Sequence, residues 1–109
     1  MKQEESPPGK GKPTPFEVIV QEILATHYKK QADYGRTGDP FANVRASEDF
    51  GIPGWVGCAV RMNDKMRRIQ TAATGKKLSN ESLRDSFLDL AVYSIIGIVL
   101  LEENAREGN

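Results

Sequence analysis

Apolar residues recur every three or four positions in three long stretches of the chain, which is the spacing of helices with one buried face. The first stretch opens with Thr14, Pro15 and Glu17: Thr14 can cap a helix, Pro15 suits its first turn, and Glu17 completes a capping box. The residues that recur after this start are Phe16, Ile19, Val20, Ile23, Leu24 and His27. We expect this helix to end at Gly35, because glycine readily adopts the left-handed conformation of a helix cap.

A second helix is expected from about Trp55 to Thr74, ending at Gly75. Its apolar residues form one stripe with alternating steps of four and three: Trp55, Ala59, Met62, Met66, Ile69 and Ala73. Its charged residues share another face, about 120° from the stripe at 100° per residue: Arg61, Asp64, Lys65 and Arg68. Before this helix, the glycines and prolines of residues 36–54 exclude a long regular element but permit a short helical turn near residues 44–49.

A third helix is expected from about Ser79 to Glu103. We expect its core face to be formed by Leu83, Phe87, Leu90, Ser94, Ile98 and Leu101. Its other side carries three carboxylates at i, i+4 and i+8, followed by apolar residues: Glu81, Asp85 and Asp89, then Val92, Ile96 and Val99. The second half of the helix is therefore apolar all round, which is typical of a helix buried from several directions. Three helices can hardly enclose it, so we expect a homodimer that completes a bundle of four or more helices.

The sequence thus predicts an all-α protein with three main helices and a long loop between the first and second. We expect a disordered N-terminal segment at residues 1–13, a helical domain at residues 14–104 and a C-terminal tail at residues 105–109. A length of 109 residues fits one domain rather than two.

Composition narrows the class of protein further. Lys plus Arg and Asp plus Glu both total 15, and this balance argues against direct nucleic-acid binding. One cysteine and one histidine make a disulfide framework and a structural zinc site poor interpretations. The longest apolar stretch, residues 91–101, is about half the ~20 residues of a membrane span, and the N-terminus has no apolar signal core. We therefore expect a cytoplasmic protein without a membrane partner.

The three carboxylates in helical register are the first candidate for chemistry. Asp85 and Asp89 would repel each other on an isolated helix, and a divalent cation would reverse that repulsion. Carboxylate oxygens, with water and substrate phosphates, are the ligands that Mg²⁺ prefers. Glu81, Asp85, Asp89 and Asp64 are therefore candidate metal ligands. The alternative interpretation is a solvated acidic face.

The basic residues of the second helix are candidates for binding phosphate, since Arg grips phosphate with two N–H groups and Lys adds a compact charge. This set comprises Arg61, Lys65, Arg68 and, from the first helix, Lys30. The first helix ends with Asp33, Tyr34 and Gly35, which could contact a base together with the following loop. The alternatives are a helix surface with ion pairs one turn apart and an ordinary helix end. No residue pattern identifies a catalytic group.

The chain resembles a known family in three motifs that occur in order. These are Lys30-x-x-Asp33-Tyr34-Gly35, Arg61-x-x-Asp64-Lys65-x-x-Arg68 and Glu81-Ser82-x-x-Asp85-x-x-x-Asp89-x-x-x-Tyr93. Together they span about residues 26 to 100 and resemble nucleotide modification associated domain 1, a small domain common in bacteriophages and some bacteria. A more distant similarity is to the all-α, MazG-like nucleoside triphosphate pyrophosphatases, although their paired-glutamate motif has no counterpart here.

These resemblances imply a phage-type, nucleotide-binding domain linked to nucleotide or DNA-base modification, located in the host cytoplasm if it is phage-encoded. The distant similarity implies Mg²⁺-dependent release of pyrophosphate from a nucleotide. Two alternatives are a non-catalytic interaction module and a structural helical dimer. A fourth, local nucleic-acid binding through the basic helix, would show strong salt dependence and is opposed by the neighbouring acidic residues.

Overall fold

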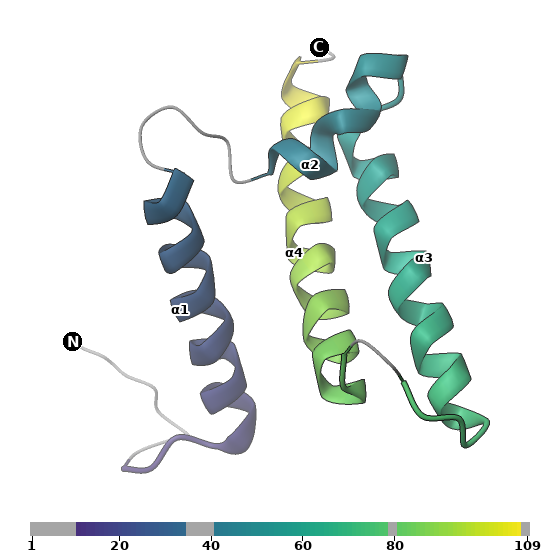
Figure 1. The fold of residues 1–109 in the computed structure, drawn as a ribbon. Coiled ribbons are helices and arrows are strands. Elements are labelled where there is room, and N and C mark those ends of the chain that lie inside the picture. The colour runs from purple at the N-terminus through teal and green to yellow at the C-terminus, as the bar shows by residue number, and fades with distance from the viewer. Residues whose placement is uncertain (1–10, 35–40, 79–80, 108–109) are drawn as a thin grey trace. The chain divides into compact units, whose positions relative to one another are not determined.

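The computed structural model describes residues 11–34, 41–78 and 81–107 of the chain. All regular structure in these residues is helical, so the all-α prediction is confirmed. The described residues form four α-helices and one 3-10 helix (Figure 1): α1 (Pro15–Tyr34), α2 (Ala42–Arg45), η1 (Ala46–Phe50), α3 (Gly54–Ala73) and α4 (Leu83–Glu107). The three long helices correspond to those expected from the sequence, and α2 is an additional helix of four residues.

The chain divides into two compact units, Met1–Thr37 and Gly38–Asn109, and each is described by itself. The first unit contains α1, which starts with the predicted capping box. The Thr14 N–H donates to Glu17 Oε1 at 2.7 Å, and the Glu17 N–H donates to Thr14 Oγ1 at 3.2 Å. Residues 11–13 precede the helix without regular structure, whereas the rest of the expected disordered segment and Gly35 lie outside the described residues.

In the second unit, α3 and α4 run antiparallel, and α2 crosses the near side of this hairpin in Figure 1. Its core contains one buried apolar residue from each of these helices: Val44 of α2, Cys58 of α3 and Leu100 of α4. The Cys58 thiol donates to the Tyr93 carbonyl at 3.0 Å, and burial raises the pKa of this thiol. Cys58 is therefore a packing residue.

The described residues just before α3, in α2 and η1, are held closely against α3. Ser47 of η1 donates through its hydroxyl to the Ile52 and Pro53 carbonyls at 3.1 and 3.2 Å. Gly57 of α3 lies directly beneath it, because a Cβ atom there would be 2.8 Å from the Val44 carbonyl oxygen and 2.6 Å from Ser47 Oγ. The short helical turn expected near residues 44–49 is thus confirmed as α2 and η1.

The face of α4 that we predicted to form the core is not the face that packs on α3, so this prediction is wrong. Leu83, Phe87, Ile98 and Leu101 are exposed, whereas Ser86 and Leu100 are the buried residues of this helix. On α3 the buried residues are Gly54 and Cys58, while Trp55 and Met66 of the predicted stripe are exposed. The physical reason is that small residues line the contact and let the two helices approach closely. The bulky stripes lie beside this contact line.

Two further expectations are corrected at the ends of α4. The helix begins at Leu83 rather than near Ser79, and it continues to Glu107, beyond the expected end near Glu103. None of the helices in the described part of the chain is long and apolar enough to cross a membrane.

Candidate functional site

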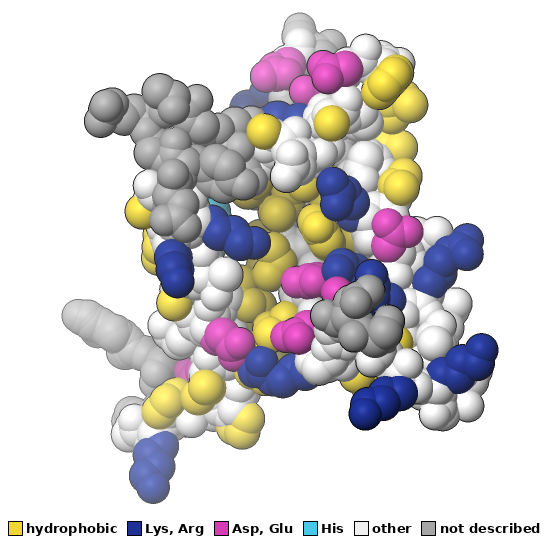
Figure 2. Space-filling view, in the orientation of Figure 1, with side chains coloured by type: hydrophobic (Ala, Val, Ile, Leu, Met, Phe, Trp, Pro, Cys, Tyr) yellow, Lys and Arg dark blue, Asp and Glu magenta, His cyan; other side chains and the backbone are white. Residues whose placement is uncertain are grey.

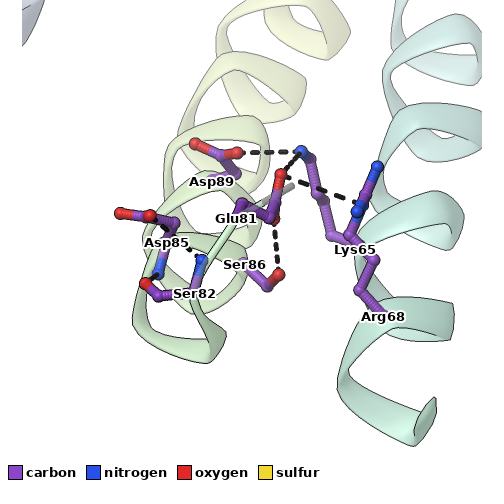
Figure 3. A network of polar contacts seen from close by, with 7 residues as sticks. All are labelled: Lys65, Arg68, Glu81, Ser82, Asp85, Ser86 and Asp89. Atoms are coloured by element: carbon purple, nitrogen blue, oxygen red, sulfur yellow. Dashed lines mark hydrogen bonds and ion pairs between the residues drawn. The ribbon is translucent and has the colours of Figure 1, made fainter. Parts of the chain in front are cut away.

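Four charged residues from α3, from α4 and from the residues just before α4 form an acid–base network: Lys65, Arg68, Glu81 and Asp89 (Figure 3). Lys65 Nζ lies 3.0 Å from Glu81 Oε1 and 2.9 Å from Asp89 Oδ2. Arg68 Nε lies 3.8 Å from the same Glu81 oxygen. The side chains of Lys65 and Glu81 are only 16% and 17% exposed, whereas those of Arg68 and Asp89 are 37% and 45% exposed. The network therefore has a covered inner pair and an outer rim open to solvent.

The hairpin explains why these residues meet. Lys65 and Arg68 are one turn apart in the second half of α3, and Glu81 lies in the turn before α4, with Asp89 in the first half of that helix. Because the helices are antiparallel and joined by a short connection, the end of one faces the beginning of the other. Figure 2 shows acidic and basic side chains gathered side by side over this end of the hairpin.

Ser86 completes the network and was not singled out from the sequence. It is fully buried in the contact between α3 and α4, and its hydroxyl donates a short hydrogen bond to Glu81 Oε2. The available signal was its position, since Ser86 stands three residues before Asp89 and thus shares its side of α4. Ser86 fixes one oxygen of the Glu81 carboxylate while Lys65 contacts the other.

The network shifts the acid–base equilibria of its inner pair. The hydrogen bond from Ser86 and then that from Lys65 lower the pKa of Glu81 below its ordinary value. The hydrogen bond to Asp89 raises the pKa of Lys65, with Glu81 adding to this effect and burial opposing it. Both residues are consequently held in their charged forms at neutral pH.

Acid should weaken the fold through Glu81. Because its pKa is lower in the folded state, its contribution to stability is present above the unfolded-state pKa of about 4.3 and is lost as the pH falls below that value through the lowered pKa. We expect Glu81→Gln to have a flatter decline in the free energy of unfolding across this range than the unmodified chain, measured by urea titration. Asn63→Ala, a change without an ionisable group at an exposed position of α3, should decline in parallel with the unmodified chain. Parallel curves for Glu81→Gln as well would contradict this assignment.

Asp85 has a different place from the one expected. The Ser82 N–H donates to Asp85 Oδ2 at 3.2 Å, and the Asp85 N–H donates to Ser82 Oγ at 3.0 Å, which is a capping box at the start of α4. Figure 3 shows the Asp85 carboxylate pointing away from Lys65. Of the remaining candidates on α3, Arg61 and Asp64 are exposed and lie outside the network.

The first of the three motifs, Lys30 to Gly35, belongs to the first unit. Lys30 is an exposed residue of α1, and Asp33 and Tyr34 are the last two residues of that helix. Gly35 lies outside the described residues. The acid–base network is formed entirely by the second unit.

Among the described residues, no group of three or more His, Cys, Asp or Glu side chains could hold an ion, and the four-carboxylate metal site expected from the sequence stays a prediction. Two carboxylates do converge, because Glu81 and Asp89 each place an oxygen within 3.0 Å of one ammonium nitrogen. A pair of this kind suits Mg²⁺ when phosphate oxygens and water complete its coordination.

Comparison with family models, curated proteins and solved structures finds no match for this chain. The resemblance to nucleotide modification associated domain 1 therefore stays a prediction, and the site must be interpreted from its own chemistry.

Proposed function

We propose that this chain is a phage-type nucleotide-binding domain of a nucleotide or DNA-base modification system, and that the acid–base network receives the phosphate groups. The observation that supports this proposal is the convergence of Lys65 and Arg68 with Glu81 and Asp89 at one end of the α3–α4 hairpin. Such a site offers cations for phosphate oxygens and carboxylates for the metal that accompanies a nucleotide.

Arg68 would make the first contact with phosphate. Its guanidinium carries five N–H donors, and its contact with Glu81 is a long one of 3.8 Å through Nε. It is also the more exposed of the two cations, so a phosphate can reach it without opening the hairpin.

Lys65 would bind phosphate only after its contact with a carboxylate has opened. Glu81 and Asp89 would hold Mg²⁺, whose chemical contribution is to neutralise phosphate charge. The Lys65 ammonium, no longer needed to balance both carboxylates, would then bind a phosphate oxygen at short range. Because Asp89 is the more exposed carboxylate, its contact with Lys65 would be the first to open.

A thermal-shift assay with a nucleotide panel tests binding. At about 100 times the dissociation constant, a nucleotide with Mg²⁺ would stabilise the fold by about 2.7 kcal/mol, which raises Tm by roughly 10 °C or more in a domain of this size. Arg68→Gln should lose most of the shift, whereas Arg67→Gln, at the neighbouring exposed position, should keep it. Asp85→Ala should lower the starting Tm through its capping box and also keep the shift. No shift with any nucleotide, or an equal shift in Arg68→Gln, would refute the proposal.

Pyrophosphate release, measured on the same panel, separates an enzyme from a binding module. Release that depends on Asp89 would extend the proposal to a Mg²⁺-dependent pyrophosphohydrolase. Binding without release would identify the second candidate, a non-catalytic module. The structural observation that favours the module is the complete internal pairing of Glu81, which accepts hydrogen bonds from both Lys65 and Ser86.

A further inference from the structure

Six large apolar side chains of the α3–α4 hairpin are exposed along the two stripes that the sequence analysis identified. We call them the apolar face: Trp55, Met66, Leu83, Phe87, Ile98 and Leu101. Their exposed fractions range from 38% to 56%. A monomer rarely leaves a contiguous patch of this kind open to water, so the exposure of these residues requires an explanation.

Both stripes lie on one side of the hairpin. At 100° per residue, the α3 stripe is roughly 90° from the contact line marked by Gly54 and Cys58, and the α4 stripe is roughly 90° from the line marked by Ser86 and Leu100. The rotation has the same sense in both helices when each is viewed from its own N-terminus. Because the helices are antiparallel, equal rotations bring the two stripes to the same side.

Part of the opposite side of the hairpin, near the start of α3, is covered by α2 and η1. Gly57 lies roughly 75° from the α3 contact line in the other sense, and it is in close contact with α2 and η1. Asp89 and Arg68 are displaced toward that same side, so the acid–base network opens away from the apolar face. A partner on the apolar face would leave the network accessible.

The spacing of the face indicates what kind of partner fits. Each stripe follows steps of three and four and contains no Asp, Glu, Lys or Arg. Trp55 to Ala73 and Leu83 to Leu101 both span about 27 Å of helix at 1.5 Å per residue. A face two helices wide, of equal length and without charge, is complementary to a second face of the same kind.

The exposed area is sufficient for self-association. Taking roughly 200 Å² for a large side chain, the six residues offer about 560 Å² per copy, or about 1,100 Å² for two copies. This total reaches the lower limit of about 1,000 Å² for specific interfaces, before the half-buried Met62, Ile69 and Leu90 add to it.

We propose that a second copy of this chain occupies the apolar face, so that two α3–α4 hairpins form a four-helix bundle with the acid–base networks on its outer surfaces. Sedimentation equilibrium of the full chain should give twice the chain mass of 12.1 kDa, falling toward the single mass on dilution. Phe87→Glu should shift the equilibrium to the monomer, because it places a charge within the interface. Dilution should also move the emission of Trp55, the one tryptophan, to longer wavelength as it becomes exposed.

Matched controls lie elsewhere on the same helices. Val60→Glu and Ile95→Glu introduce the same charge at exposed apolar positions outside the two stripes, and both should remain dimeric. If the unmodified chain sediments with the mass of the monomer at every concentration, the proposal is overturned. The occupant of the apolar face would then be a segment of the same chain, such as α1. Equal dissociation by Val60→Glu and Phe87→Glu would overturn the choice of face. Neither result bears on nucleotide binding, since Phe87 lies outside the network.

Discussion

Replacement of Lys65 by Met should lower the free energy of unfolding by about 2 kcal/mol, one of the two largest effects that we expect from a single substitution. Lys65 contacts both the Glu81 and the Asp89 carboxylate, and its own side chain is mostly covered. Removing one partner of a fully buried pair costs about 3–5 kcal/mol, because the other charge stays behind without compensation. The partial exposure of Asp89 reduces this figure through solvent screening.

Urea titration at neutral pH measures this loss, with Lys76→Met as the control at an exposed position. The source of the loss can be isolated with Glu81→Gln and the double substitution. If Lys65 acts by balancing Glu81, the double variant should be more stable than the sum of the two single losses predicts, by about 1 kcal/mol. A loss no larger than that of Lys76→Met would mean that the network is a solvated surface cluster.

The ends of α1 and α3 were largely predictable because their signals are local. A capping box such as Thr14–Glu17 depends on residues three positions apart, and the predicted hydrogen bonds are present. The same local signal was present at Ser82 and Asp85, where a Ser precedes a carboxylate by three residues. We interpreted Asp85 as a metal ligand because it continues the spacing of Glu81 and Asp89, and spacing along a helix does not show which backbone groups a side chain contacts.

The contact between α3 and α4 was not predictable from hydrophobic periodicity. That method gives the greatest weight to bulky residues, and these lie on the stripes beside the contact. Gly54, Cys58 and Ser86 carry little apolar surface, yet they determine the contact because they let the helix backbones approach. Helical spacing accordingly places Lys65 on a charged face away from the stripe, whereas in the structure it lies against α4 with its ammonium between two carboxylates.

It was predictable that the basic half of α3 would lie near the acidic half of α4, where Lys65 contacts Glu81 and Asp89. An expected helix end near residue 74 and an expected start near residue 79 place the charged half of one helix beside the acidic half of the next. The particular partners depend on rotation about the helix axes, which the sequence does not specify. This is why Arg61 and Asp64, on the same predicted face, remain at the surface.

Replacement of Gly57 by Ala should also destabilise the protein by about 2 kcal/mol, even though alanine favours helix over glycine. The added Cβ would lie 2.8 Å from the Val44 carbonyl oxygen, which belongs to the backbone and can move only if α2 moves. Ser47 Oγ would lie at 2.6 Å, and its displacement would break its bonds to the Ile52 and Pro53 carbonyls. Overpacking of this kind costs about 1–3 kcal/mol and exceeds the gain in helix propensity of at most about 1 kcal/mol.

Gly97→Ala is the matched substitution on α4, and it should have the opposite sign. A Cβ atom there would lie 3.7 Å from Cys58 Sγ, an ordinary van der Waals distance, so the propensity gain of up to about 1 kcal/mol remains. Urea titration of the two variants therefore compares one chemical change at two glycines of the same hairpin. If Gly57→Ala were as stable as Gly97→Ala, α2 and η1 would have to lie further from α3 than the structure places them. The segment that covers the side of the hairpin opposite the apolar face would then be only loosely attached.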